Sequence, residues 1–566
     1  MATKVVIVGA GFLGVSVAKT YLEVDPTIHL TILESESTIG GTWSKSRVYP
    51  ELTAQQPFGV YEFPDKSIPT AGYRKTDFVP AEAIHQHIEE YAKEHGIYDC
   101  IRFNATVTKI RRAEDGIRWI VWTDDGKDML VADKLVIATG STSKPTIPEI
   151  STEKFEKEVF HTKDLGKKHE YLLSDAVKTV TVYGGGKSAM DTVHLCTKAG
   201  KHVHWVVRTS HNGVPAFFPD TFLGMSSNDI ITTRLGKMQH PSPLDTSSWC
   251  YRFFHSGHNP VGYHLHWMCW NIISKMMLKQ TGYFKSDNMG KLRPELEDHH
   301  AWWANTPPGI ITHPEVIDRI HEGKNVTIHR QSITSLSGDR VILDAGELQT
   351  DVLIWATGYD SRIDPFSIED SITLGIPTPV SQVPTSVKKH WDDLESAAEA
   401  EVLRLFPRLA NPPKVTNCEP KYTPFRLYRT LVPLACIQKD VPDRSLVFAG
   451  TFSVGSSAMM SVAVSLWAVA WMTGNVDVTL SSEELDKQLA MAIVFSKRRY
   501  LSIGTQGPVA LYDYMTDIDS MLNELGVNPK RKKGTLKDFF EPYAPRDYKD
   551  IVPEWKKAHG LDKASQ

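Results

Sequence analysis

Two glycine-rich turns lie far apart in the chain, and each follows a short apolar run. The first turn, residues 9–14, comes after Lys4–Val8, and the second, residues 184–189, comes after Thr179–Tyr183. A buried strand, a glycine-rich turn and a helix in this order form a dinucleotide-binding unit. Two complete units argue against a chance match, so the fold is predicted to be α/β, with two doubly wound nucleotide-binding domains.

The first turn carries glycines at the spacing that a bound pyrophosphate needs. Gly9 permits the tight turn, Gly11 lets backbone N–H groups approach the phosphates, and Gly14 allows close packing of helix on strand. The next apolar run, residues 30–33, ends at Glu34, whose carboxylate would accept hydrogen bonds from ribose hydroxyls. Because that carboxylate would repel an additional phosphate, we assign FAD to this site.

The second turn is followed by a strand that ends in a base instead of an acid. Residues 202–207 lead to Arg208, and Thr209 and Ser210 stand beside it. A guanidinium pairs well with the extra phosphate that distinguishes NADPH from NADH. We therefore assign NADPH to the second site.

Size and charge restrict the class of protein further. A chain of 566 residues is too long for one hydrophobic core and should contain two or three domains. The formal net charge of −4 gives no reason to expect nucleic acid or an anionic membrane as a partner. Because the first strand begins at Lys4, no cleavable leader is expected, and we predict a cytoplasmic location.

Neither the cysteines nor the longest apolar stretch indicates a disulfide framework or a membrane span. The six cysteines are scattered and contain no CxxC pair, which argues against a disulfide scaffold and against a dithiol reductase. The longest apolar stretch, residues 458–472, contains Ser461 and Ser465 and is shorter than a membrane-spanning helix. We expect it to form a buried helix.

Residues from about 211 to 310 are rich in aromatic residues, histidine and methionine, and are expected to form a largely helical insertion. Tyr263, Trp267 and Trp270 recur at helical spacing, which favours a stripe that faces the core over one that contacts substrate or rests on a membrane. Four histidines in the segment have no acidic or cysteine partner at ligand spacing, so no metal is expected. These histidines are His264, His266, His299 and His300.

The chain is predicted to cross between the two domains twice. The apolar strands 134–137 and 352–355 each run into an Ala-Thr-Gly segment, as expected if the second domain is inserted into the first. A further strand, residues 445–449, would return to complete the first sheet. The predicted architecture is two Rossmann-like domains, in which residues 1–168 form the first part of the FAD domain, residues 169–355 the NADPH domain, and residues 356–566 the return and a C-terminal extension.

A Gly-Gly-Thr-Trp segment at residues 40–43 completes a pattern that resembles the flavin-containing monooxygenases, in particular the fungal type often met in secondary metabolism. The resemblance covers nearly the whole chain. It implies an enzyme in which NADPH reduces FAD, and the reduced flavin reacts with O2 to a C4a-hydroperoxide that oxygenates a small organic substrate. It implies FAD contacts by Gly9, Gly11, Phe12, Leu13, Gly14, Glu34, Gly41, Thr42, Trp43, Val107, Thr139 and Gly140, and NADPH contacts by Gly184, Gly186, Lys187, Ser188 and Arg208.

The identifying motif of that family, FxGxxxHxxx(Y/F), is present only in part. Phe155 and His161 are in place, but Lys157 replaces the glycine and Leu165 replaces the aromatic residue. A structural role for His161 is therefore favoured over a functional one. The leucine also departs from the tryptophan of Baeyer–Villiger enzymes, which weakens that alternative without excluding it.

Two glutamines occupy the place where many members of the family carry an asparagine near the flavin. Gln55 and Gln56 are therefore candidate catalytic residues, with Gln55 preferred. The alternative is that they belong to a polar loop that caps a turn. An FAD- and NADPH-binding oxidase, or a redox-responsive binding module without oxygenation activity, also stays open. Neither the substrate nor the oligomeric state follows from the sequence.

Overall fold

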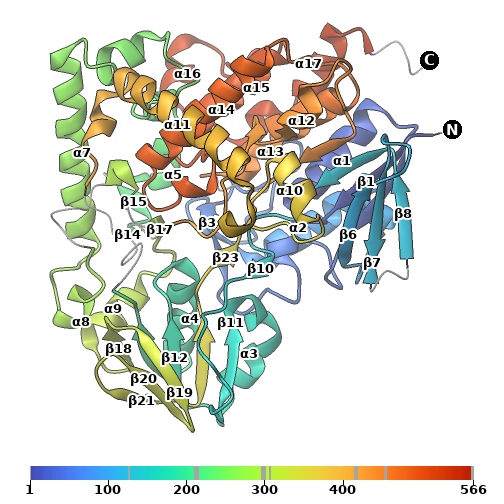
Figure 1. Cartoon of the computed structure of the whole chain (residues 1–566). Helices are drawn as coiled ribbons and strands as arrows, with labels where there is room; N and C mark the ends of the chain where they lie inside the picture. Colours follow the sequence, from blue (N-terminus) through green and yellow to red (C-terminus); the bar gives the residue numbers. More distant parts are fainter. Residues whose placement is uncertain are drawn as a thin grey trace.

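The first apolar run of the sequence forms strand β1 (Lys4–Val8), four of whose five residues are buried. The computed structural model describes residues 2–124, 128–209, 216–222, 224–294, 301–304, 308–413, 419–450 and 455–561. In this part of the chain the principal strands form two five-stranded parallel sheets with helices packed around them (Figure 1). The predicted pair of doubly wound α/β domains is confirmed.

The first sheet is built from both ends of the sequence. Strand β1 pairs with β2 (His29–Leu33) on one side and with β9 (Lys134–Ile137) on the other. Strand β5 (Ile101–Arg102) adds to β2, and β26 (Leu446–Phe448) adds to β9. The C-terminal part of the chain therefore returns to complete the first sheet.

Helix α13 (Ser457–Met472) packs against α1 (Phe12–Val24) in the core of this domain. It contains the apolar stretch 458–472, every residue of which is buried. Ser465 donates a hydrogen bond to Ser16 on α1 at 2.9 Å, so a polar group inside the core is satisfied. The predicted buried helix is confirmed. Among the residues that the structure describes, no helix is long and apolar enough to span a membrane.

The second sheet contains one strand that the sequence analysis assigned to the first domain. Strand β11 (Glu158–His161) ends before residue 169, where the sequence placed the start of the NADPH domain, yet it pairs with β22 (Val352–Trp355) at the far end of that domain. Pairing over such a distance in the chain leaves no local pattern in the sequence. In spatial order the strands are β11 (Glu158–His161), β22 (Val352–Trp355), β12 (Thr179–Tyr183), β13 (His202–Val206) and β18 (Val326–His329).

Two short antiparallel strands connect the domains. Strand β10 (Lys144–Pro145) leads into the second domain, and β23 (Tyr359–Asp360), which pairs with it, leads back. Figure 1 shows this pair between the two large sheets. We propose these strands as the domain boundaries, in place of residues 168 and 355.

Each domain also carries a small antiparallel sheet. In the first domain it consists of β6 (Val107–Arg112), β7 (Trp119–Thr123) and β8 (Asp128–Ala132). In the second domain it consists of β19 (Ile333–Ser337), β20 (Arg340–Leu343) and β21 (Glu347–Gln349).

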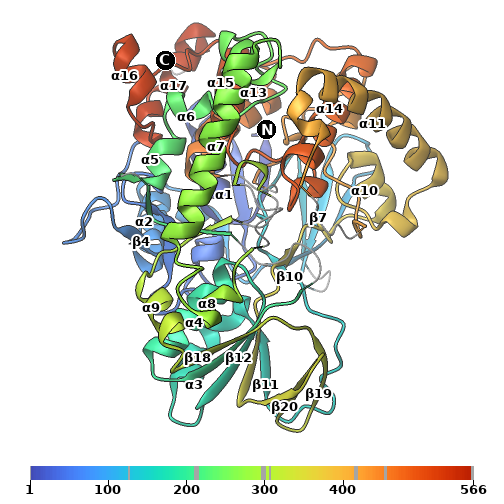
Figure 2. The same cartoon turned by 90° about the vertical axis from the view of Figure 1, so that its left-hand side faces the viewer.

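The longest helix of the aromatic-rich segment is α7 (Pro260–Gln280), which lies on the side of the molecule that faces the viewer in Figure 2. It begins at a proline, and the side chain of Asn259 accepts a hydrogen bond from the N–H of Val261, a combination that favours a helix start. Other described parts of the segment form α5 (Ser227–Ile231), α6 (Arg234–Lys237) and α8 (Asp287–Gly290), together with the short strands β14 (Ala216–Phe218) and β17 (Pro308–Ile310).

The aromatic stripe of α7 faces the protein. The guanidinium of Arg408 lies 3.9 Å from the ring centre of Tyr263 and 4.5 Å from that of Trp267. Trp267 and Trp270 pack against a buried cluster formed with helices α11 (Thr385–Leu405) and α14 (Ser482–Arg499). The predicted core-facing stripe is confirmed. The opposite face of α7 exposes the apolar side chains Val261, Leu265, Met268 and Ile272.

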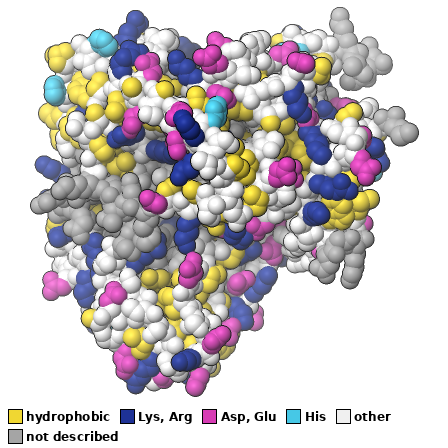
Figure 3. Space-filling view, in the orientation of Figure 1, with side chains coloured by type: hydrophobic (Ala, Val, Ile, Leu, Met, Phe, Trp, Pro, Cys, Tyr) yellow, Lys and Arg dark blue, Asp and Glu magenta, His cyan; other side chains and the backbone are white. Residues whose placement is uncertain are grey.

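The surface and the thiols carry little further information about function. On the face drawn in Figure 3, acidic and basic side chains are interspersed. The cysteines in the described part of the chain are free thiols: Cys100, Cys196, Cys250, Cys269 and Cys436. Cys418, His299 and His300 lie outside the described residues.

Candidate active site

A cavity of about 820 Å³ lies at the carboxyl ends of β1 and β2, where the first glycine turn enters α1. Its walls come from that turn, from residues 40–43, from the segment 138–145 and from residues 362–365. The first turns of α13 contribute Ser457 and Met460. In open α/β sheets this position, beside the N-terminus of the first helix, is where a nucleotide binds.

The glycines of the first turn allow backbone contacts that a side chain would block. Gly9 has a φ of 107°, and a β-carbon there would lie 2.5 Å from the carbonyl oxygen of Ala138, next to β9. A β-carbon at Gly14 would lie 2.0 Å from the carbonyl oxygen of Gly9. A β-carbon at Gly11 would fill the space beside Gly41, whose Cα would be 3.7 Å away. The resulting cradle of bare backbone fits the pyrophosphate of a dinucleotide.

Glu34 lines the cavity and also braces the turn. The residue is 4% exposed, its Oε2 accepts a hydrogen bond from the N–H of Ala10 at 2.8 Å, and its Oε1 accepts one from the N–H of Glu36 at 2.9 Å. A carboxylate accepts about four hydrogen bonds, so acceptor capacity remains for ribose hydroxyls. The sequence analysis expected only the ribose contact.

Cations from both domains line the same cavity, and the sequence analysis missed them. Lys163 lies in the short helix η4 (Thr162–Asp164), and Lys167 lies in α3 (Leu165–Leu173), both in the second domain. The Nζ of Lys163 donates to the carbonyl oxygen of Ser143 at 2.6 Å. Such charges suit the phosphates of a nucleotide. The cationic lining residues are Arg47, Lys144, Lys163, Lys167 and Arg362.

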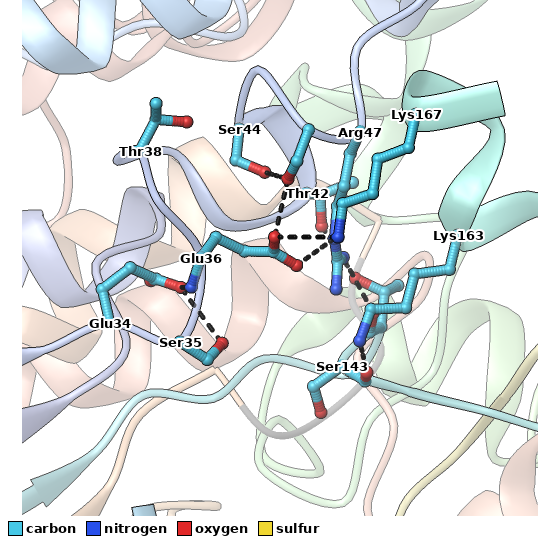
Figure 4. Close-up of polar contacts among 12 residues, drawn as sticks. Glu34, Ser35, Glu36, Thr38, Thr42, Ser44, Arg47, Ser143, Lys163 and Lys167 are labelled. Carbon is cyan, nitrogen blue, oxygen red and sulfur yellow. Dashed lines mark hydrogen bonds and ion pairs between the residues drawn. The ribbon is translucent and has the colours of Figure 1, made fainter. Parts of the chain in front are cut away.

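Glu36 lies among these cations, as Figure 4 shows. Its Oε2 accepts a hydrogen bond from Ser46 at 2.7 Å, and Arg47 and Lys167 each place a nitrogen 3.7 Å from its carboxylate. Burial by itself would raise the pKa of Glu36, but the Ser46 hydrogen bond and the charges of Lys167, Arg47 and Lys163 outweigh burial and lower the pKa. Glu36 is therefore ionised at neutral pH and orders the cations around it.

Aromatic side chains cover one wall of the cavity. The Nε1 of Trp43 donates to the hydroxyl of Tyr61 at 2.8 Å, and the two rings meet edge to face with centres 5.6 Å apart. Phe12 contacts Tyr61 at 5.1 Å between ring centres and stacks on Phe63 at 4.2 Å. Burial raises the pKa of Tyr61, so its hydroxyl is neutral. This wall excludes water and holds the ring of Trp43 in one orientation.

The residues expected to contact FAD lie together around this cavity. Gly14 is the exception, because it packs behind the turn against Gly9. The expected residues in the lining are Gly9, Gly11, Phe12, Leu13, Glu34, Gly41, Thr42, Trp43, Val107, Thr139 and Gly140.

The second glycine turn has a similar geometry. Gly184 has a φ of 139°, and a β-carbon there would lie 2.1 Å from the carbonyl oxygen of Ala356. Gly186 immediately precedes helix α4 (Lys187–Lys198), and Ser188 is exposed in its first turn. The carbonyl of Gly184 accepts a hydrogen bond from the indole of Trp205 at 2.7 Å. A second cradle therefore opens at the N-terminus of α4.

The two charged residues expected at the NADPH site have different surroundings. Lys187 is largely buried and forms an ion pair with Asp191 one helical turn later, so its charge braces α4. Arg208 follows the end of β13 by two residues and is exposed. Because the carboxyl ends of parallel strands share one edge, Arg208 lies on the same edge of the sheet as the second turn.

Gln55 and Gln56 lie on strand β3 (Thr53–Pro57) and are not among the residues that line the 820 Å³ cavity. The side-chain oxygen of Gln55 accepts a hydrogen bond from the N–H of Ile310 at 2.8 Å, which fastens β17 to β3. The Nε2 of Gln56 donates to the carbonyl oxygen of Gly455, just before α13, at 3.2 Å. Each amide therefore has one bond within the protein.

His161 has a well-defined structural environment at the end of β11. It is 2% exposed, its Nδ1 accepts a hydrogen bond from the N–H of Lys163 at 3.0 Å, and its ring meets Tyr359 edge to face at 5.1 Å. Burial lowers its pKa to about 4, so the ring is neutral, as an accepting nitrogen requires. These contacts support the structural role favoured from the sequence.

Comparison with known proteins identifies relatives along the whole chain. A family model described as pyridine nucleotide-disulphide oxidoreductase matches residues 6–217. The FAD-dependent monooxygenase rstn6 of Aspergillus nomiae is 34% identical over 98% of this chain and 98% of its own length. The FAD-dependent monooxygenase resA of Aspergillus sclerotiorum is 33% identical over 97% of both chains. The solved structure of cyclohexanone monooxygenase from Rhodococcus sp. Phi1 bound to NADP+ has a TM-score of 0.58 at 16% identity, and the match covers 93% of this chain and 97% of that chain.

These relationships carry different weights. The solved structure shows a shared fold and no more, because its sequence identity to this chain is only 16%. The fungal relatives are similar over nearly the whole length of this chain and of their own. The resemblance drawn from the sequence, the prediction of an oxidoreductase and the prediction of FAD as a cofactor are confirmed. The chain belongs to the family of FAD-dependent monooxygenases.

Proposed function

We propose that this enzyme uses NADPH and O2 to insert one oxygen atom into a small organic substrate, with FAD in the cavity of the first domain and NADPH at the second glycine turn. When bound, FAD supplies the chemistry of hydride acceptance and oxygen activation. The observation that carries the proposal is the presence of Lys163 and Lys167, from the second domain, in the wall of the first domain's cavity. The second domain therefore contributes side chains to the cavity of the first.

In the first domain the proposed roles follow from chemistry and position. The bare backbone at Gly9 and Gly11 would receive the pyrophosphate, and Glu34 would accept ribose hydroxyls. Arg47 would balance the phosphate charge together with Lys163, because both side chains line the cavity.

In the second domain we propose Arg208 as the residue that selects NADPH. It is an exposed guanidinium at the carboxyl edge of the sheet, whereas Lys201, at the opposite end of β13, is buried and donates to the carbonyl oxygens of Ser174 and Val177 at 2.6 and 2.9 Å. Lys201 therefore already has partners. Gly184, Gly186 and Ser188 would surround the pyrophosphate at the N-terminus of α4.

We keep Gln55 and Gln56 as candidates for the amide that acts near the flavin. The oxygen of Gln55 is engaged by Ile310, so the NH2 group is the part of this side chain that would donate to a reacting oxygen. Gln56 uses its NH2 group on Gly455, beside the residues that lead into α13. A donor at this place would hold the reacting oxygen atoms and slow the release of peroxide.

The substrate class is open between nitrogen or sulfur oxygenation, Baeyer–Villiger oxygenation of a ketone and carbon hydroxylation. The fungal origin of the full-length relatives supports a role in secondary metabolism. The cytoplasmic location expected from the sequence stays a prediction.

The decisive experiment measures how much product is formed for each NADPH consumed. The purified FAD-loaded protein is supplied with NADPH, O2 and a panel of thioethers, amines and ketones, while product, peroxide and NADPH are quantified. A monooxygenase with a suitable substrate forms close to one product per NADPH. An oxidase releases about one peroxide per NADPH with every member of the panel, and that result would favour the alternative without oxygen transfer.

A further inference from the structure

Two histidines and a glutamate from distant parts of the chain meet outside the FAD cavity. Glu51 precedes β3 in the first domain, His194 lies on α4, and His313 precedes helix α9 (Glu315–Glu322) in the second domain. One potential ligand atom from each of the three lies within 4.8 Å of the others. Among the described residues, no other group of three or more histidine, cysteine or acidic side chains has this spacing.

His194 is a buried imidazole without hydrogen-bond partners. It is 1% exposed, and neither of its ring nitrogens has a partner in the structure. Its Nε2 faces two carboxylates, with Glu51 Oε2 at 3.6 Å and Glu315 Oε1 at 3.7 Å. A buried polar ring without hydrogen-bond partners is costly unless another group satisfies it.

His313 is oriented as a metal-binding histidine would be. Its Nε2 lies 2.9 Å from the backbone carbonyl oxygen of Glu51, and because a carbonyl only accepts hydrogen bonds, Nε2 carries the proton. Nδ1 therefore has a free lone pair, and it lies 3.9 Å from Glu315 Oε1. Histidine ligands of metals characteristically donate their second N–H to a carbonyl or carboxylate in this way.

The two histidine rings are stacked beside the carboxylates. The rings of His194 and His313 are parallel, with an interplanar angle of 6° and ring centres 3.9 Å apart, so their lone pairs lie in separate parallel planes, and one ring would have to rotate for both to reach a common ion. An adjoining cavity of about 900 Å³ is lined by Glu51 and His313 and connects the cluster with solvent. An ion can therefore reach the cluster without unfolding the protein.

We propose that Glu51, His194 and His313, with Glu315 as a fourth donor, bind a divalent transition-metal ion of the Zn²⁺ type. Nitrogen and carboxylate oxygen ligands in a set of four are typical of Zn²⁺. With metal–ligand bonds of about 2.0–2.1 Å, neighbouring donors of a tetrahedral site lie about 3.3 Å apart. The separations of 3.6 and 3.7 Å from His194 Nε2 to the two carboxylates are near this value.

Binding would require small side-chain movements. Lys198 now lies 2.8 Å from Glu51 Oε2, and the ion would replace this contact or leave Lys198 on the second oxygen. Because Glu51 belongs to the first domain and both histidines belong to the second, the ion would join the two domains. This site lies outside the nucleotide-binding residues, and the inference does not depend on the oxygenation reaction.

The test measures Zn²⁺ binding to the full-length FAD-loaded protein, freed of any affinity tag and treated with EDTA. Competition with a chromogenic chelator should give one Zn²⁺ per chain in the wild type, with no displacement by excess Mg²⁺. Glu51→Gln and His313→Ala should each raise the dissociation constant by about tenfold or more, since even outer-shell changes cost about tenfold to a hundredfold. His264→Ala, which alters an exposed histidine on α7, should leave the constant unchanged.

Two further readouts separate metal binding from a general loss of structure. Glu51 is exposed, so Glu51→Gln should keep the wild-type circular dichroism spectrum and flavin content while losing Zn²⁺ affinity. Co²⁺ in place of Zn²⁺ should give the visible bands of a four-coordinate ion in the wild type, and weaker bands in the variant. The proposal is overturned if the wild type takes up no stoichiometric Zn²⁺, or if Glu51→Gln and His313→Ala bind Zn²⁺ as tightly as the wild type.

Discussion

Gly166 and Ser46 meet backbone to backbone between the two domains: a β-carbon on Gly166 would lie 2.5 Å from the carbonyl oxygen of Ser46. Gly166 is in the first turn of α3, next to Lys167, and Ser46 donates the hydrogen bond that holds Glu36. This close approach lets cations of the second domain reach the cavity of the first.

A Gly166→Ala substitution should therefore weaken FAD binding. The added methyl group would push α3 away from residues 46–47, and overpacking of this kind costs ~1–3 kcal/mol. If this destabilisation affects only the FAD-bound protein, the dissociation constant of FAD rises by about fivefold to a hundredfold. Fluorescence titration of the apoprotein with FAD measures the constant. Gly290→Ala is a matched control, because the atom nearest to its β-carbon would be 3.8 Å away. An unchanged FAD affinity in Gly166→Ala would show that α3 can move without affecting the FAD site.

A substitution in the first glycine turn should have a large effect on FAD binding. The wild type should purify yellow, with FAD that is released on denaturation, because the cavity offers a cradle of backbone and no attachment chemistry is implied. Gly14→Ala should reduce bound FAD by about tenfold or more, since its β-carbon would overlap the carbonyl oxygen of Gly9 at 2.0 Å. The ratio of flavin to protein absorbance reports occupancy. Release of FMN, or flavin retained on the denatured chain, would contradict the assignment.

Arg208 should determine the preference for NADPH over NADH. A charge-assisted hydrogen bond to the extra phosphate is worth ~1.5–3 kcal/mol, or about tenfold to a hundredfold in affinity. Arg208→Ala should weaken NADPH by this factor and leave NADH nearly unchanged, as measured by the rate of flavin reduction at varied cofactor concentration. Arg340→Ala, in the small antiparallel sheet of the same domain, serves as a control for lost charge. An equal loss for both cofactors would remove Arg208 from the phosphate site.

Gln55 and Gln56 can be distinguished by how tightly each variant couples NADPH consumption to oxygen transfer. Loss of a hydrogen bond to a reacting oxygen costs ~1–3 kcal/mol, which shifts the partition between oxygen transfer and peroxide release by about tenfold or more. The catalytic glutamine, changed to Ala, should leave flavin reduction nearly intact while peroxide per NADPH rises in the presence of substrate. If Gln55→Ala alters only thermal stability, its bond to Ile310 is its main role. If both variants remain fully coupled, the amide acts elsewhere.

His161 should make the protein less stable in acid. Its pKa is lowered to about 4 in the folded protein, below the ordinary value of 6.5, so the unfolded chain binds more protons between these values. The contribution of His161 is therefore fully present above pH 6.5 and is lost as the pH falls towards 4. In His161→Asn an oxygen can still accept from the Lys163 N–H, but it does not titrate. The decline of Tm from about pH 7 to about pH 5 should be smaller in this variant than in the wild type. His264→Asn, on the exposed side of α7, should keep the wild-type decline.

The sequence by itself determined those parts of the site that lie within one strand, turn and helix. The spacing of Gly9, Gly11 and Gly14 and the acid at Glu34 specify a local backbone shape, so the turn could be described before the fold was known. The same reasoning identified the buried helix 458–472, because a long and mainly apolar stretch is stable in water only when it is buried. The sequence also indicated the family, because the two nucleotide-binding units and the Gly-Gly-Thr-Trp segment between them can be recognised from the order of residues alone.

Only the tertiary structure decided which distant residues share a space. Lys163 and Lys167 belong to the second domain but line the cavity of the first, and β11 joins a sheet on the far side of the predicted boundary. The same holds for Glu51, His194 and His313, which the sequence analysis did not consider together. Local propensities and motifs record the conformation of a short segment. The approach of two segments depends on the packing of whole domains, which leaves no fixed spacing in the sequence.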